Sequence, residues 1–177
     1  MTAITENQTV IVTGLPRSGT SMMMKMLEAG GLPPLCDGQR AADSDNPNGY
    51  YEFEAVKQTK KDPSWLAQAP GKAVKMVYKL LYDLPDDRRY AVIFMRRDLK
   101  EILASQQQML QNMGVTTDVS DQRMASLFEH EIACFQNRLA TAPHIFSLEV
   151  PYNDIASGRE EPIQAINEHL GGRLNTA

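Results

Sequence analysis

Apolar residues in this chain form short continuous runs, and between these runs they recur at the spacing of an amphipathic helix. Two runs, TVIVTG (9–14) and YAVIFMRR (90–97), contain β-branched residues in close succession and predict buried parallel strands. HIFSLEV (144–150) predicts a third strand, and KAVKMVYKLL (72–81) predicts a strand that continues into a helix.

Helical spacing of apolar residues predicts four longer helices and one short helix. They are expected in GTSMMMKMLEA (19–29), YYEFEAVKQTKK (50–61, the short one), DLKEILASQQQMLQNMG (98–114), SDQRMASLFEHEIACFQNRLATA (120–142) and REEPIQAINEHLGG (159–172). Ser120 is the predicted N-cap of the helix that follows it. Because strands alternate with helices, we expect one α/β domain over residues 1–177, a three-layer αβα fold with a central parallel sheet.

Composition and charge narrow the classes of function. The 177 residues carry a net charge of −4, which argues against a general nucleic-acid-binding protein. No apolar run approaches the ~20 residues that span a bilayer, and the N-terminus lacks a signal-peptide pattern, so we expect a cytoplasmic protein with no membrane partner. Cys36 and Cys134 do not cluster with the histidines, so no metal site is expected. His130 and His169 are interpreted as surface residues of predicted helices.

The segment GLPRSGTS (14–21) connects the first predicted strand to the first predicted helix. Its glycines have the spacing of the phosphate-binding loop G-x-x-x-x-G-K-[ST], but Thr20 stands at the lysine position and Arg17 lies inside the loop. Backbone N–H groups of such a loop, and the positive end of the helix that follows, bind anions. Thr20 and Ser21 add hydroxyl donors, and Arg17 adds a permanent charge. We therefore expect an anion site at this loop.

The absent lysine bears on the kind of anion. Nucleoside triphosphatases neutralise their substrate with the loop lysine, Mg²⁺ and an acidic residue at the end of a neighbouring strand. Here the strand VIFMRR ends in Arg96 and Arg97, so a metal-holding acid is not evident. ATP hydrolysis is therefore a poor fit. Charge pattern alone favours a surface salt bridge of Arg97 with Asp98 or Glu101.

Three segments together resemble the sulfotransferases that use 3′-phosphoadenosine 5′-phosphosulfate (PAPS). The family's 5′-phosphosulfate loop, P-[KR]-S-G-T-[TS], is matched at every position by Pro16, Arg17, Ser18, Gly19, Thr20 and Ser21. Its 3′-phosphate segment has an arginine at a strand end and a serine eight residues later, a spacing matched by Arg97 and Ser105. Its third segment resembles PYNDIASGREEPIQAINEHLGG (151–172), and DSDNPNGYYEFE (43–54) resembles a segment of small bacterial members. The resemblance spans residues 8 to about 172.

The resemblance implies a P-loop-kinase-like fold and transfer of a sulfuryl group from PAPS to a hydroxyl or amine, with PAP (3′-phosphoadenosine 5′-phosphate) as the product. The loop would bind the 5′-phosphosulfate, Arg97 and Ser105 the 3′-phosphate, and Tyr152 would lie near the adenine. Arg17 would also act in catalysis by stabilising charge on the leaving phosphate. No metal is required by this chemistry. The acceptor class, whether a small molecule, a glycan or a peptide, and the oligomeric state stay open.

Two departures from the family pattern remain. Many members have a late glycine-rich and basic segment, R-K-G-x-x-G-D-W-K, that has no counterpart after HLGG, so a short branch, a truncated chain and an incomplete donor site stay open. The catalytic base is also open, because YKLLYDLP offers Lys79 where some members have a histidine. Glu52 is the preferred base, and Glu54 and Asp37 are alternatives. The rival functions are a P-loop kinase or NTPase and a nucleotide-binding module without catalysis.

Overall fold

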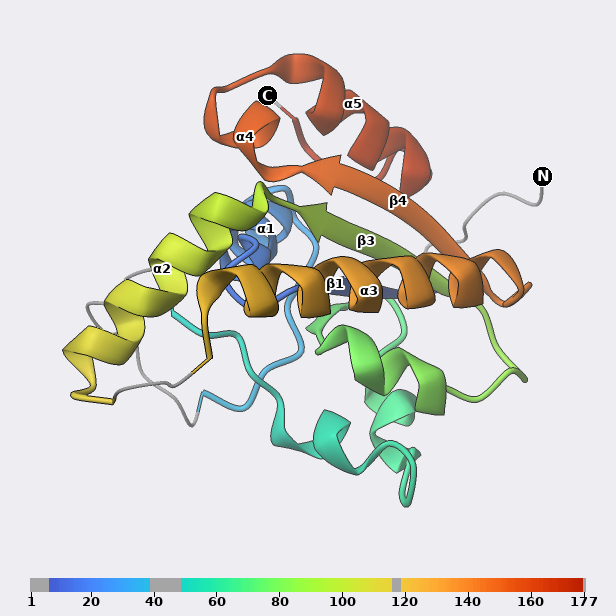
Figure 1. The fold of residues 1–177 in the computed structure, drawn as a ribbon. Coiled ribbons are helices and arrows are strands. Elements are labelled where there is room, and N and C mark those ends of the chain that lie inside the picture. Colours follow the sequence, from blue (N-terminus) through green and yellow to red (C-terminus); the bar gives the residue numbers. More distant parts are fainter. Residues whose placement is uncertain (1–6, 39–48, 116–118, 177) are drawn as a thin grey trace.

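The centre of the molecule is a parallel β-sheet. The computed structural model describes residues 7–38, 49–115 and 119–176, and within them it has a four-stranded sheet in the order β2-β1-β3-β4 (Figure 1). The strands are β1 (Thr9–Gly14), β2 (Ala73–Lys75), β3 (Tyr90–Arg96) and β4 (Ile145–Pro151). All three strand pairs are parallel, and each strand was predicted from its apolar run.

Helices connect and cover these strands. They are α1 (Thr20–Ala29), α2 (Leu99–Asn112), α3 (Asp121–Ala140), α4 (Tyr152–Ala156) and α5 (Glu160–His169), with the 3₁₀ helices η1 (Glu54–Gln58), η2 (Ser64–Gln68) and η3 (Tyr78–Asp83). The predicted cap of α3 is confirmed, since Ser120 Oγ accepts a hydrogen bond from the Arg123 N–H. Asp98 caps α2 in the same way, by accepting from the N–H groups of Lys100 and Glu101.

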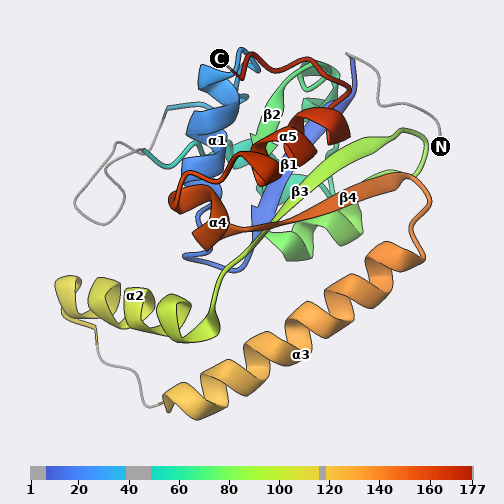
Figure 2. The same ribbon diagram turned by 90° about the horizontal axis from the view of Figure 1, so that it is seen from above.

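Each face of the sheet is covered by helices, which makes three layers. Seen from above, α1, α4 and α5 lie on one side of the strands, and α2 and α3 lie on the other (Figure 2). Successive side chains of β1 point to opposite faces of the sheet. Val10 and Val12 pack in the core beneath α1 and α5, and Ile11 packs in the core on the other face. The predicted α/β class with three layers and a central parallel sheet is confirmed, and the glycine loop follows β1, an inner strand of that sheet.

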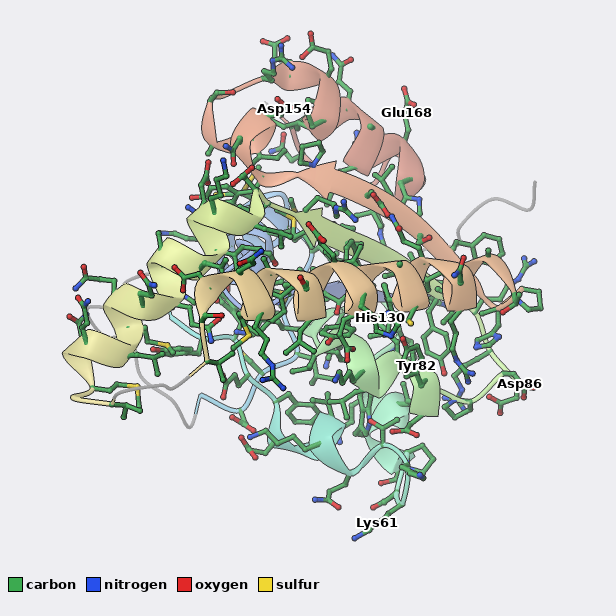
Figure 3. The ribbon with its side chains drawn as sticks, viewed as in Figure 1. Lys61, Tyr82, Asp86, His130, Asp154 and Glu168 are labelled. Carbon is green, nitrogen blue, oxygen red and sulfur yellow. The ribbon has the colours of Figure 1, made fainter. Side chains whose placement is uncertain are left out.

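An aromatic cluster holds α3 against the sheet. Phe135 is fully buried, and its ring stacks on Phe94 of β3 with the ring centroids 4.9 Å apart. Tyr78 meets the same ring edge-on at 5.8 Å, and Tyr82, which is labelled below α3 in Figure 3, lies 6.1 Å from it. Aromatic pairs in these geometries add to the free energy of burial. Phe135 is therefore the main anchor of a helix that is otherwise largely exposed.

The two helical histidines differ from each other. His130 is exposed on α3, as predicted (Figure 3). The prediction for His169 is wrong: it lies three residues after buried Ile166 on the same face of α5, and burial lowers its pKa by disfavouring the charged imidazole. Among the described helices, none has the length and apolar character needed to cross a bilayer.

Replacing Phe135 with alanine should lower the free energy of unfolding by about 3–5 kcal/mol, because it removes a buried aromatic ring and leaves a cavity. Urea unfolding followed by circular dichroism measures this loss. Leu127→Ala on the same helix is the matched control, since Leu127 is 50% exposed and its truncation should stay within about 0.5 kcal/mol of the parent. Equal losses in the two variants would contradict the anchoring role of Phe135.

Candidate functional site

A cavity of about 550 Å³ opens where the strands end at their carboxyl termini. Its wall is supplied by the loop after β1, the end of β2, the residue after β3 and the residue after β4. This volume lies within the range of about 300–1,000 Å³ that is typical of small-molecule sites. Nine of the residues predicted to bind or react line it: Pro16, Arg17, Gly19, Thr20, Ser21, Glu52, Arg97, Ser105 and Tyr152.

The loop between β1 and α1 bends sharply through left-handed backbone. Arg17 has φ 67° and Gly19 has φ 95°. A left-handed residue other than glycine costs about 1–2 kcal/mol, so Arg17 needs contacts that hold it there. Its contacts include a hydrogen bond from its Nε to Ser105 Oγ at 2.9 Å and one that its carbonyl oxygen accepts from Arg97 Nη1 at 3.0 Å. The predicted 5′ and 3′ halves of the site are thus joined by direct hydrogen bonds.

The start of α1 favours a bound anion. Thr20 and Ser21 are the first two residues of this helix, and both line the cavity. The first turn, all of which the structure describes, contains no acidic side chain. The positive end of the helix dipole is therefore not offset by a carboxylate of its own first turn.

The sequence allows two roles for Arg97, a salt bridge and a phosphate contact, and its position in the structure is compatible with both. Its Nε donates to Glu101 Oε2 at 2.8 Å, which is the expected salt bridge, while Asp98 caps α2 instead. The guanidinium carbon also lies 4.2 Å from the centroid of the Tyr152 ring. Hydrogen bonds from Arg97 and Asn153 hold the pKa of Glu101 below its usual value. Arg97 is therefore fixed in the cavity wall by a carboxylate, a carbonyl and a ring.

Gly19 allows the Tyr152 ring to approach the loop. A Cβ atom at residue 19 would fall well inside contact distance of the ring carbons Cδ2 and Cε2 of Tyr152. Because α4 begins at Tyr152 directly after β4, the strand end determines the position of this ring. The Tyr152 ring therefore forms part of the cavity wall beside the loop.

Ser18 differs from the other loop residues that were predicted to bind the donor. Ser18 is not among the described residues that line the cavity, and it is only 1% exposed. Its Oγ is directed under the loop, where a Cβ on Gly14 would collide with it, and this oxygen has no hydrogen-bond partner among the described residues. Its N–H donates to the carbonyl of Leu15. In this geometry Ser18 shapes the loop from beneath.

The structure separates the three candidate acids. Glu52 lines the cavity. Glu54 forms an ion pair with Lys57, and Asp37 accepts a hydrogen bond from the backbone N–H of Glu54 at 2.7 Å. Neither Glu54 nor Asp37 is among the described residues of the cavity wall. The preferred candidate, Glu52, is thus also the one that can reach a ligand.

Lys75 is a cavity residue that the sequence analysis missed. It ends β2, and its Nζ donates to Ser21 Oγ at 3.3 Å. The ammonium group also lies 5.8 Å from the centroid of the Tyr50 ring. The sequence signal that could have identified Lys75 is a lysine at the end of a predicted apolar strand, because such a strand end can lie beside the loop that follows β1. Lys79, which stands where some members of the resembled family have a histidine, forms a salt bridge with Glu131 at 3.0 Å. A cation thus reaches the loop from β2, although the loop's own lysine position holds Thr20.

Within the described ranges, no three His, Cys, Asp or Glu side chains are grouped so that they could hold a metal ion.

No protein-family model matches the chain, and no curated protein matches it. Among solved structures, the chain is similar to an unliganded sugar kinase from Janibacter sp. HTCC2649, at 13% sequence identity and a TM-score of 0.40 over 93% of each chain. A likeness this weak carries no information about function.

Gly19→Ala should lower the free energy of unfolding more than the same substitution at a left-handed glycine whose new methyl group meets no neighbour. The new methyl group meets the Tyr152 ring, and such overpacking costs about 1–3 kcal/mol beyond the backbone strain. Gly158→Ala is the matched control, because Gly158 has φ 77° and a Cβ added there would meet nothing within 4 Å. Thermal or urea unfolding of both variants gives the difference. Equal destabilisation would show that the ring moves aside without cost.

Proposed function

We propose that this protein transfers a sulfuryl group from PAPS to a hydroxyl or amine group of an acceptor. The observation that carries the proposal is the convergence of three distant segments on one cavity, where Arg17, Arg97, Ser105 and Tyr152 are connected by direct contacts. These are the residues that the family resemblance assigns to the two ends of the donor. Their convergence supports the resemblance, because the strand ends that the parallel sheet brings together carry the side chains that the resemblance assigns to one ligand.

The donor's charges match the groups that the cavity offers. In this proposal the loop N–H groups, Thr20 and Ser21 bind the 5′-phosphosulfate, with Arg17 beside them. Arg97 and Ser105 bind the 3′-phosphate, and Tyr152 contacts the adenine. A guanidinium already oriented by other contacts loses little freedom on binding, and its planar fork suits a phosphate.

The chemical step is a single substitution at sulfur. The acceptor oxygen or nitrogen forms a new bond to the sulfur atom, and the bond from sulfur to the 5′-phosphate oxygen breaks. The electron pair of the broken bond stays on that phosphate oxygen, where Arg17 and Lys75 stabilise the added charge. Glu52 accepts the acceptor's proton and later releases it to water. The products are PAP and a sulfate ester or a sulfamate.

Calorimetric titration of the purified protein with PAP, ADP and Mg-ATP tests the donor assignment. We expect micromolar binding of PAP and at least tenfold weaker binding of ADP, because only PAP carries the 3′-phosphate. Tight binding of Mg-ATP with weak binding of PAP would overturn the proposal and favour a kinase or NTPase. Tight PAP binding without turnover of PAPS on any acceptor in a broad panel would favour a nucleotide-binding module.

Arg97→Ala should weaken PAP binding by about 2 kcal/mol, roughly 30-fold, because a charge-assisted contact is lost. It should weaken ADP binding far less, so the preference for PAP disappears. Arg96→Ala is the matched control, since Arg96 is the last residue of β3, directly before Arg97, and lies beside Glu149 instead of in the cavity wall. A PAP preference that survives in Arg97→Ala would contradict the assignment of the 3′-phosphate site.

A further inference from the structure

The two ends of the cavity differ in chemistry, and the strand order explains how. The phosphate-type loop follows β1, which lies between β2 and β3. On the β3 and β4 side the cavity wall contains Arg97, Ser105 and Tyr152, the groups that suit a nucleotide. Toward β2 the wall has five apolar side chains, Phe53, Val56, Met76, Val77 and Leu80, beside the polar or charged Tyr50, Glu52, Lys57 and Lys75.

The apolar end is open to a ligand and firmly supported. Val77 lies between β2 and η3 in the cavity wall, and its side chain is 55% exposed. Val56 and Met76 also line the cavity, and both are buried in the core. The Phe53 ring packs edge-on against buried Trp65, with the centroids 6.2 Å apart. Ligand pockets are typically concave, with a mostly apolar lining and a few polar groups that orient the ligand, and this end of the cavity has that composition.

The charged groups of the cavity wall near this end are Glu52, Lys57 and Lys75. The Lys57 ammonium is paired with Glu54, so its charge is balanced within η1. Lys75 contacts Ser21 at the boundary with the loop, and Glu52 precedes Phe53 in the chain. A saccharide would bring many hydroxyl groups against this carbon wall, and each buried hydroxyl without a partner costs free energy.

We propose that the acceptor is a small apolar molecule with a single hydroxyl group, such as a phenol or naphthol, which enters from the β2 side. This inference rests on the proposed function and deepens it by naming the acceptor class. The ring system packs on Val77, Leu80 and Phe53, and the hydroxyl oxygen faces the loop, where Glu52 takes its proton as the oxygen bonds to sulfur. The bond from sulfur to the 5′-phosphate oxygen breaks, and its electron pair remains on PAP.

The test uses the full chain saturated with PAP, titrated in parallel with 2-naphthol and with methyl β-D-glucoside. We expect 2-naphthol to bind at least tenfold more tightly than the glucoside. Val77→Asp should weaken 2-naphthol binding at least tenfold and leave PAP binding unchanged, which also shows that this variant is folded. Val115→Asp is the matched control, because Val115 is similarly exposed at 47% and is not among the described residues of the cavity wall.

The outcomes separate this inference from the function on which it rests. PAP binding together with a preference for the glucoside overturns the acceptor class and leaves the sulfotransferase proposal standing. Equal effects of Val77→Asp and Val115→Asp on 2-naphthol overturn the location of the acceptor. Failure of PAP to bind overturns the proposed function, and the acceptor inference with it.

Discussion

The parallel pairing of β1 with β3 is the constraint on which the site depends. Gly14, the last residue of β1, is in register with Met95, so Arg97 emerges beside the loop that Gly14 begins. From there it donates to the carbonyl of Arg17. A shift of this register by one residue would reverse the faces of the buried side chains and carry Arg97 away from the loop. Core packing and site geometry are therefore enforced by the same strand pair.

Much of the fold and the loop could be predicted because their signals are local. A short apolar run, a glycine at the turn and helical spacing each operate over a few residues, and they located β1, β3, α2 and α3 correctly. The five-residue helix α4 was missed, because a helix this short has no periodicity of its own and depends on the strand before it.

The finer features of the site depend on contacts between distant segments, which a single sequence does not show. Glu52 and Glu54 are two residues apart and chemically alike, and only the ion pair of Glu54 with Lys57 and the position of Glu52 in the cavity wall distinguish them. Lys75 lies beside the loop because β2 pairs with β1, which brings the end of β2 next to the start of α1. Burial of His169 likewise follows from the packing of α5 on the sheet.

The positive charge around the loop is assembled from three strand ends. Arg17 follows β1, Lys75 ends β2 and Arg97 follows β3, whereas a triphosphate-binding loop carries its lysine within the motif. The chain as a whole has a net charge of −4, so this positive region is local and set in an acidic molecule. Under the proposed function this local field would attract the phosphate groups of the donor. Affinity for the donor would then depend on the folded sheet, and substitutions that disturb strand register would weaken it even where they touch no ligand.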